Sequence, residues 1–251
     1  MDVLCRRDED FRSFVHNDWL PLIHLHCQYS YENPSRFSSA NNHLIAEYAG
    51  LFIASVKWPF KESPKWIRYA QKGLEKEIVL QHSENGINRE EAAEYIQFIT
   101  DFFLLSFVVG KNAGLPFSNA YASRLRQIFD YIFHFLDGKG NFPKYGDEDD
   151  GKCFVSELTE HNNNNFQSIL ASGAILFGDA GWKAKSGGFD RKNELLFGRE
   201  GKRIFDSLPD VELQESSRFY ENEGHFICRK TDGKKEVYFH FDAAPLGYLS
   251  I

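Results

Sequence analysis

The stretch from Ser38 to Phe52, SSANNHLIAEYAGLF, places polar side chains at the start of an otherwise apolar helical segment. We expect Asn41 to cap this helix, which puts Asn42 and His43 in its first turn, beside open backbone amides. An anionic group is favoured there because the amides and the helix dipole attract negative charge. Glu47 lies one helical turn after His43 and is predicted to orient the imidazole. Ordinary helix capping explains the same pattern, so the stretch alone leaves both interpretations open.

A second polar stretch, NGINREEAAEYIQF, runs into another apolar helical segment. Asn88 and Glu91 have the spacing of a capping box, which predicts that a helix begins at Asn88 and holds Tyr95 two turns in. Arg89, near the start of the same segment, supplies a cation. Taken alone, a tyrosine at this place is more typical of a core or surface position than of a catalyst.

A third stretch, YGDEDDGK, is acidic and rich in glycine. Asp147, Asp149 and Asp150 resemble part of a calcium loop, but the spacing and the missing distal glutamate do not fit an EF-hand. A solvated acidic turn is the competing interpretation. The nine histidines and four cysteines show neither metal-ligand spacing nor a CxxC motif, so we predict no metal site in this chain.

The overall composition narrows the classes of partner. A formal net charge of −7 and the lack of a basic stripe argue against nucleic acid, whose phosphates attract clustered lysine and arginine. A local basic patch still permits an acidic polysaccharide as a partner. The sequence contains no run of 18 apolar residues, so we expect no membrane span. The charged N-terminal segment does not fit a signal peptide.

Helical periodicity dominates the first four fifths of the chain, and a period of two follows it. The predicted helices cover residues 10–28, 42–57, 63–81, 88–110 and 118–137, then the segment after the asparagine run at 162–165, and a short piece within 187–198. Two turns, at Asn222 to Gly224 and at TDGKK, separate three predicted antiparallel strands. We therefore predict a mainly α protein of antiparallel helical hairpins in residues 1–205, a linker at 206–217 and the start of a β domain at 218–251.

Four ordered motifs together resemble the heparinase II/III-like polysaccharide lyases. They are SSANNHLIAEYAGLF, NGINREEAAEYIQF, FPKYGDEDDGK and the C-terminal GHFICRK with EVYFHFDAAPLGYLSI. The resemblance implies an incomplete (α/α) toroid followed by the first strands of an antiparallel β-sandwich. It also implies β-elimination on a uronic-acid-containing polysaccharide, of the heparan sulfate or alginate kind, and the motifs do not choose between these substrates.

The resemblance also implies roles for individual residues. Asn42 and His43 match the pair that contacts the substrate carboxylate, and Tyr95 matches the tyrosine that takes or delivers a proton. An unperturbed tyrosine has a pKa near ~10, so Tyr95 needs cationic or hydrogen-bonding help to act as a base. His43 and Arg89 are the local candidates for that help, and Glu47, Arg89, Asp149 and Asp150 are further substrate-binding candidates.

The chain departs from the family pattern at its C-terminal end. The family continues after the DAGPLG-like segment into HGHAD, which supplies a catalytic histidine and, in some members, a metal ligand. Ile251 precedes that segment, and the first toroid helices are expected ahead of Met1. We therefore expect weak or no activity from this chain, no cofactor within it and a divalent metal only in a full-length protein. Relatives are commonly periplasmic or secreted, whereas this sequence leaves the localisation open.

Two other functions remain open at this point. One is a non-catalytic protein that binds acidic glycans, in which Tyr95 has no role. The other is a toroidal glycoside hydrolase, which needs two carboxylic acids beside the scissile bond, with Glu47 and one of Asp147, Asp149 and Asp150 as candidates.

Overall fold

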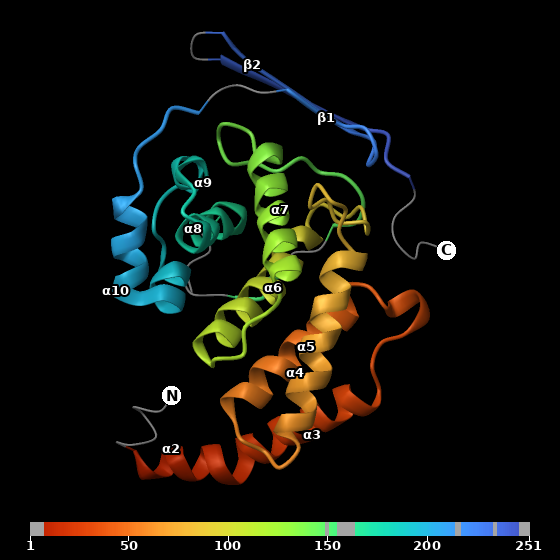
Figure 1. The fold of residues 1–251 in the computed structure, drawn as a ribbon, viewed down its shortest axis with the longest axis vertical. Coiled ribbons are helices and arrows are strands. Elements are labelled where there is room, and N and C mark those ends of the chain that lie inside the picture. Colours follow the sequence, from red (N-terminus) through yellow and green to blue (C-terminus); the bar gives the residue numbers. More distant parts are fainter. Residues whose placement is uncertain (1–7, 149–150, 155–163, 214–216, 233–234, 246–251) are drawn as a thin grey trace.

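The computed structural model describes residues 8–148, 151–154, 164–213, 217–232 and 235–245. It shows a helical body with a small sheet across one end (Figure 1). The helices are α2 (Glu9–Phe14), α3 (Leu20–Glu32), α4 (Asn42–Lys57), α5 (Ser63–Leu80), α6 (Tyr95–Asn112), α7 (Asn119–Phe135), α8 (Asn165–Phe177), α9 (Ala180–Lys185) and α10 (Arg191–Ser207). A π-helical turn, η1 (Val15–Trp19), joins α2 to α3, and a 3₁₀ turn, η2 (Phe37–Ser39), precedes α4. The predicted mainly α class is confirmed.

Local sequence signals set most helix ends. Asn41, Ser118, Asn164 and Asp190 each cap a helix by accepting a backbone N–H of its first turn, as expected of short polar side chains. The start of α4 and the cap at Asn41 are therefore confirmed. Helix α8 ends at Gly178, whose φ of 71° lies in the left-handed region that glycine adopts without strain.

Two predicted helices differ from the structure. Helix α6 begins at Tyr95, so the prediction of a helix from Asn88 is wrong. The Asn88 side chain instead forms hydrogen bonds with His82 and with the backbone of Glu90. The short helix predicted within 187–198 is longer, because α10 runs to Ser207 with non-helical backbone at Gly198. The predicted division into domains at 205 and 217 remains a prediction.

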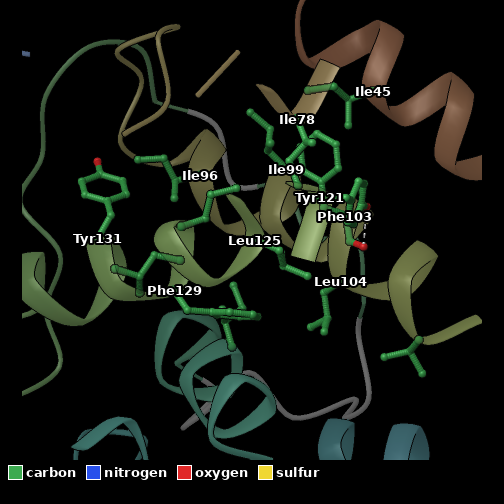
Figure 2. Packing of buried hydrophobic residues seen from close by; sticks show 14 of the residues in the cluster. Ile45, Ile78, Ile96, Ile99, Phe103, Leu104, Tyr121, Leu125, Phe129 and Tyr131 are labelled. Atoms are coloured by element: carbon green, nitrogen blue, oxygen red, sulfur yellow. Dashed lines mark hydrogen bonds between the residues drawn. The ribbon is translucent and has the colours of Figure 1, made fainter. Parts of the chain in front are cut away.

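Aliphatic and aromatic side chains from the middle helices form one core. Helix α4 packs on α5 and α6, and α7 packs on α5, α6 and α8. Figure 2 shows Ile45, Ile78, Ile99, Phe103 and Leu125 converging from four of these helices. All five are fully buried. Burying each such side chain contributes about 1.5–3 kcal/mol, so this core holds the start of α4 and the start of α6 in fixed places.

A buried ion pair joins α6 to α10. The Lys192 ammonium donates to Asp101 Oδ1 at 2.9 Å and to Asn165 Oδ1 at 3.0 Å, while Asn165 donates to the other Asp101 oxygen at 3.0 Å. The Lys192 and Asp101 side chains are 2% and 1% exposed. Both charges are thus desolvated and depend on each other and on Asn165 for compensation.

The sheet has the order β1-β2-β3 and is antiparallel throughout, as predicted. Its strands are β1 (Arg218–Tyr220), β2 (His225–Asp232) and β3 (Lys235–Asp242). One face packs on the end of α7, where the Tyr238 hydroxyl donates to the Phe135 carbonyl at 2.8 Å. Figure 1 shows the sheet lying across this end of the helical body. None of the described helices is long and apolar enough to span a membrane.

We predict that Asp101→Ala lowers the free energy of unfolding by about 3–5 kcal/mol, because it leaves the Lys192 ammonium buried without its counter-charge. The matched control is Glu200→Gln, which breaks an exposed ion pair with Arg203 on α10 and is expected to cost less than about 1 kcal/mol. Urea unfolding followed by circular dichroism measures both. Equal effects of the two substitutions would contradict the assignment of Asp101 as the essential buried counter-ion.

Candidate functional site

Asn42 lies in the first turn of α4, and its side chain is held by a carboxylate from another part of the chain. Its Nδ2 donates to Glu90 Oε1 at 2.6 Å, and Asn41 Nδ2 donates to the same oxygen at 3.0 Å. Asn42 is buried and Glu90 is half-buried. Burial raises the pKa of Glu90, and the hydrogen bonds from Asn42 oppose that shift. The polar start of α4 is therefore bound to the loop that leads into α6.

The two other candidates on α4, His43 and Glu47, contact different groups. His43 is exposed, and its backbone N–H donates to the Asn41 side chain at 3.4 Å. Both oxygens of Glu47 accept from Ser35, one from its backbone N–H at 2.8 Å and one from its hydroxyl at 2.6 Å. The prediction that Glu47 orients the His43 ring is wrong, because this carboxylate fastens the segment before α4.

Tyr95 is the first residue of α6 rather than a residue two turns inside it. It is half-buried, its backbone N–H donates to the Ala92 carbonyl at 3.1 Å, and its ring lies 5.2 Å from that of Phe98. Only four residues lie between it and Glu90. The loop from Glu90 to Tyr95 therefore connects the carboxylate that holds Asn42 with the candidate proton-transfer group.

Glu91, the neighbour of Glu90, contacts a different part of the molecule. Its Oε2 lies 2.9 Å from His225 Nε2, and His225 Nδ1 lies 3.0 Å from His240 Nε2. The two imidazoles stack, with ring centroids 5.3 Å apart, and His225 is completely buried. Asp242 Oδ1 lies 3.9 Å from His225 Nδ1. This row of groups ties the loop before α6 to strands β2 and β3.

Aromatic groups cover the histidine pair. The Tyr145 ring lies 5.3 Å from His225 and 5.2 Å from His240, and the Tyr145 and Tyr131 hydroxyls form a hydrogen bond. Burial raises the pKa of both tyrosines well above the usual value. Burial and the neighbouring His225 lower the pKa of His240 to about 4. These tyrosines stay protonated at neutral pH, and His240 stays neutral.

Arg89 lies on the wall of a cavity of about 680 Å³ between the loop before α6 and the sheet. Glu84, Glu91 and Glu223 line the same cavity, and both Glu223 oxygens accept from the Asn85 side chain at 3.0 and 3.1 Å. Three carboxylates against one guanidinium leave this wall acidic. The placement therefore disfavours the cavity itself as the seat of a uronate carboxylate.

A second cavity, of about 870 Å³, lies at the other end of the contact between the helices and the sheet. Lys139, Lys185, Arg229 and Lys235 line it together with Asp137 and Glu236. Two of these cations are already engaged, since Lys185 and Arg229 donate to backbone carbonyls that include that of Leu136.

The acidic stretch is only partly described. Asp147 is exposed and close enough to Glu90 to affect its pKa, whereas Asp149 and Asp150 lie outside the described residues. Among the described residues, no three His, Cys, Asp or Glu side chains form a group that fits a metal ion. The described cysteines, Cys27, Cys153 and Cys228, are free.

Sequence reasoning missed Glu90, Glu91 and His225 as members of the site. Glu91 was assigned to a helix cap, but its φ of 53° places it in a tight loop outside any helix. The two adjacent carboxylates before Tyr95 were the available signal, yet their targets lie 48 and 134 residues away along the chain. Such distant pairing leaves no local pattern.

The chain matches a family model and is similar to solved structures. The family model described as Heparinase II/III N-terminus matches residues 8–171. The crystal structure of the heparan sulfate lyase HepC from Pedobacter heparinus is similar to this chain, with a TM-score of 0.61 at 21% identity over 92% of this chain. A heparinase III, the BT4657 gene product, gives 0.62 at 18% identity over 92% of this chain.

These matches show that the helices and the sheet have the fold of the corresponding region of those structures, so the predicted toroid is confirmed. The match covers 32% of either solved chain, and this chain thus spans about a third of their length. No curated protein sequence matches the chain.

We predict that wild-type stability falls as pH drops from about 6.5 to 4. The pKa of His240 is about 4 in the folded state against 6.5 unfolded, so the unfolded state binds the extra proton in this window. The loss is about 1–2 kcal/mol after allowance for solvent screening of a half-exposed ring. His240→Gln removes this part of the slope, measured by urea unfolding at several pH values. An unchanged slope in the variant would show that His240 does not titrate as its surroundings require.

Proposed function

Since this chain belongs to the heparinase II/III family, whose N-terminal model matches residues 8–171, we propose that it forms the toroid side of a polysaccharide lyase site. The substrate is a uronic-acid-containing polysaccharide, and the reaction is β-elimination. The observation that carries the proposal is the Glu90 loop, which holds the Asn42 amide by a 2.6 Å hydrogen bond and leads directly into Tyr95.

The chemistry needs groups of these two kinds. Elimination removes the hydrogen on carbon 5 of a uronate, next to a carboxylate whose negative charge opposes formation of the enolate. A fixed hydrogen-bond donor stabilises the charge that develops on this carboxylate. Asn42 supplies a donor whose position is set by Glu90, and His43, exposed beside it, supplies a second.

Tyr95 is the proposed proton-transfer residue. As a general acid it delivers its proton to the leaving glycosidic oxygen, which requires no lowering of its pKa. As a general base it removes the carbon 5 proton, which requires a neighbouring cation or hydrogen-bond donor. Arg89 was proposed for that help, but it lies among Glu84, Glu91 and Glu223, so His43 is the better candidate.

Heparan sulfate is the first substrate to test, because the similar Pedobacter heparinus structure is of a heparan sulfate lyase. Alginate is the second, since the chemistry at carbon 5 is the same for any uronate linkage. The acidic wall around Arg89 suggests that the sulfated chain follows the α4 side of the site rather than this cavity.

We predict that this chain binds heparan sulfate oligosaccharides saturably, and that Asn42→Ala weakens binding about tenfold through loss of one hydrogen bond to a charged group. Calorimetry measures the affinity, and Glu200→Gln, remote on α10, is the control. A chain that binds neither heparan sulfate nor alginate would contradict the proposed function.

Turnover is followed by the ultraviolet absorbance of the unsaturated uronate, in the longest form of the protein that contains this chain. Tyr95→Phe is expected to lower the rate by about 10²–10⁴-fold while leaving binding almost unchanged. New reducing ends without absorbance would identify a hydrolase instead. Saturable binding without either product would identify a glycan-binding protein.

A further inference from the structure

We propose that Glu90 is the positioning residue of the site. Its carboxylate holds the Asn42 amide with Nδ2, rather than Oδ1, toward Glu90. The second N–H of Nδ2 is then left as the donor for the substrate carboxylate. This inference rests on the proposed function and adds to it a residue that touches no substrate.

Glu90 and Asn42 differ in which hydrogen bonds they can form. An ionised carboxylate only accepts hydrogen bonds, whereas an amide both donates and accepts. Asn42 must therefore turn its Nδ2 toward Glu90 Oε1, and the opposite rotamer would set Oδ1 against a negative oxygen. Nδ2 carries two hydrogens, and the 2.6 Å bond uses one of them. The remaining N–H stays in the amide plane, in a direction set by Glu90.

The ionised carboxylate of Glu90 carries a desolvation cost because it is partly buried. Among the described residues, its Oε2 is buried without a hydrogen-bond partner. Burial raises the pKa of this carboxyl, and nearby Asp147 acts in the same direction, while His43 and the donors of Asn42 act against it. A neutral side chain would fit the same place at lower desolvation cost. The gain from the charge is the orientation of the amides that it holds.

The backbone at the start of α4 has an anchor besides Glu90. The Gln81 side chain donates to the Ala40 carbonyl at 3.3 Å and to the Asn41 carbonyl at 3.2 Å. Gln81 also donates to Glu77 at 3.0 Å, so it is anchored within α5. Substitution of Glu90 therefore leaves the bonds of Gln81 to the start of α4 in place.

Glu90 is itself held from the other side of the loop. Its backbone N–H donates to Asn88 Oδ1 at 2.9 Å, and Asn88 Nδ2 lies 3.1 Å from His82 Nε2. Burial lowers the pKa of His82 to about 3, so this imidazole stays neutral at any pH where the site would work. Its Nε2 then accepts an N–H of the Asn88 side chain. The chain of bonds from His82 to Asn42 gives the carboxylate one fixed position.

The first test observes the amide directly in the wild-type chain. The side-chain NH₂ signal of Asn42, assigned by its loss in Asn42→Ala, is followed by nitrogen–proton NMR as the pH falls from 8 to 3. We expect a titration step that belongs to Glu90, lost in Glu90→Gln and retained in Glu200→Gln. A wild-type signal that does not respond to pH would overturn the proposal.

The second test measures binding of a heparan sulfate tetrasaccharide by calorimetry. Glu90→Gln is expected to weaken binding at least fivefold with little change in melting temperature, and Glu90→Asp to recover part of the loss. Equal affinity of wild type and Glu90→Gln would overturn the positioning role while leaving the proposed function intact. A wild type that shows the titration step but no binding would overturn the function and leave the orientation of Asn42 by Glu90 standing.

Discussion

The carboxylates of Glu90 and Glu91 hold together the parts of the chain on which the site depends. Glu90 accepts from Asn41 and Asn42 at the start of α4, and Glu91 contacts His225 at the start of β2. The backbone turns at Glu91, between these two contacts. The positive φ of Glu91, 53°, is that turn. A non-glycine residue adopts it at some cost in strain, which the surrounding contacts offset.

The acidic stretch takes part in this junction through its backbone. Ala93 donates to the Tyr145 carbonyl at 3.0 Å, and a Cβ on Gly146 would come within 1.8 Å of the Glu91 carbonyl oxygen. Gly146 also has a φ of 67°, so both space and conformation require glycine there. The first glycine of YGDEDDGK thus serves close backbone packing, a role distinct from the calcium loop that its aspartates suggest.

Sequence patterns predicted the parts of the fold that local chemistry decides. The cap at Asn41, the span of α4 and the three strands follow from side chains near each element in the chain. The start of α6 could not be predicted in this way. A capping-box pattern at Asn88 and Glu91 favoured a helix, but bonds to His82 and His225, made only in the folded chain, outweighed that preference.

The candidate site also combines residues that local patterns predict with contacts that form only in the folded chain. Asn42 and Tyr95 are predicted from motifs that resemble a family, whereas the contact of Glu90 with Asn42 comes from pairing between distant parts of the chain. Glu47 was a reasonable partner for His43 by helical spacing, yet Ser35 offers its carboxylate two donors. Spacing shows which side chains can meet, and competition among donors in the folded chain decides which do.

Asn42 is the proposed ligand of a uronate carboxylate near Tyr95. A crystal structure of this chain with a heparan sulfate tetrasaccharide tests that claim most directly. We predict a uronate carboxylate within hydrogen-bond distance of Asn42 Nδ2, with carbon 5 or the glycosidic oxygen beside the Tyr95 hydroxyl and the Glu90 bond preserved. An oligosaccharide seated instead in the cavity of Lys139, Arg229 and Lys235, with Asn42 and Tyr95 free of sugar, would contradict it.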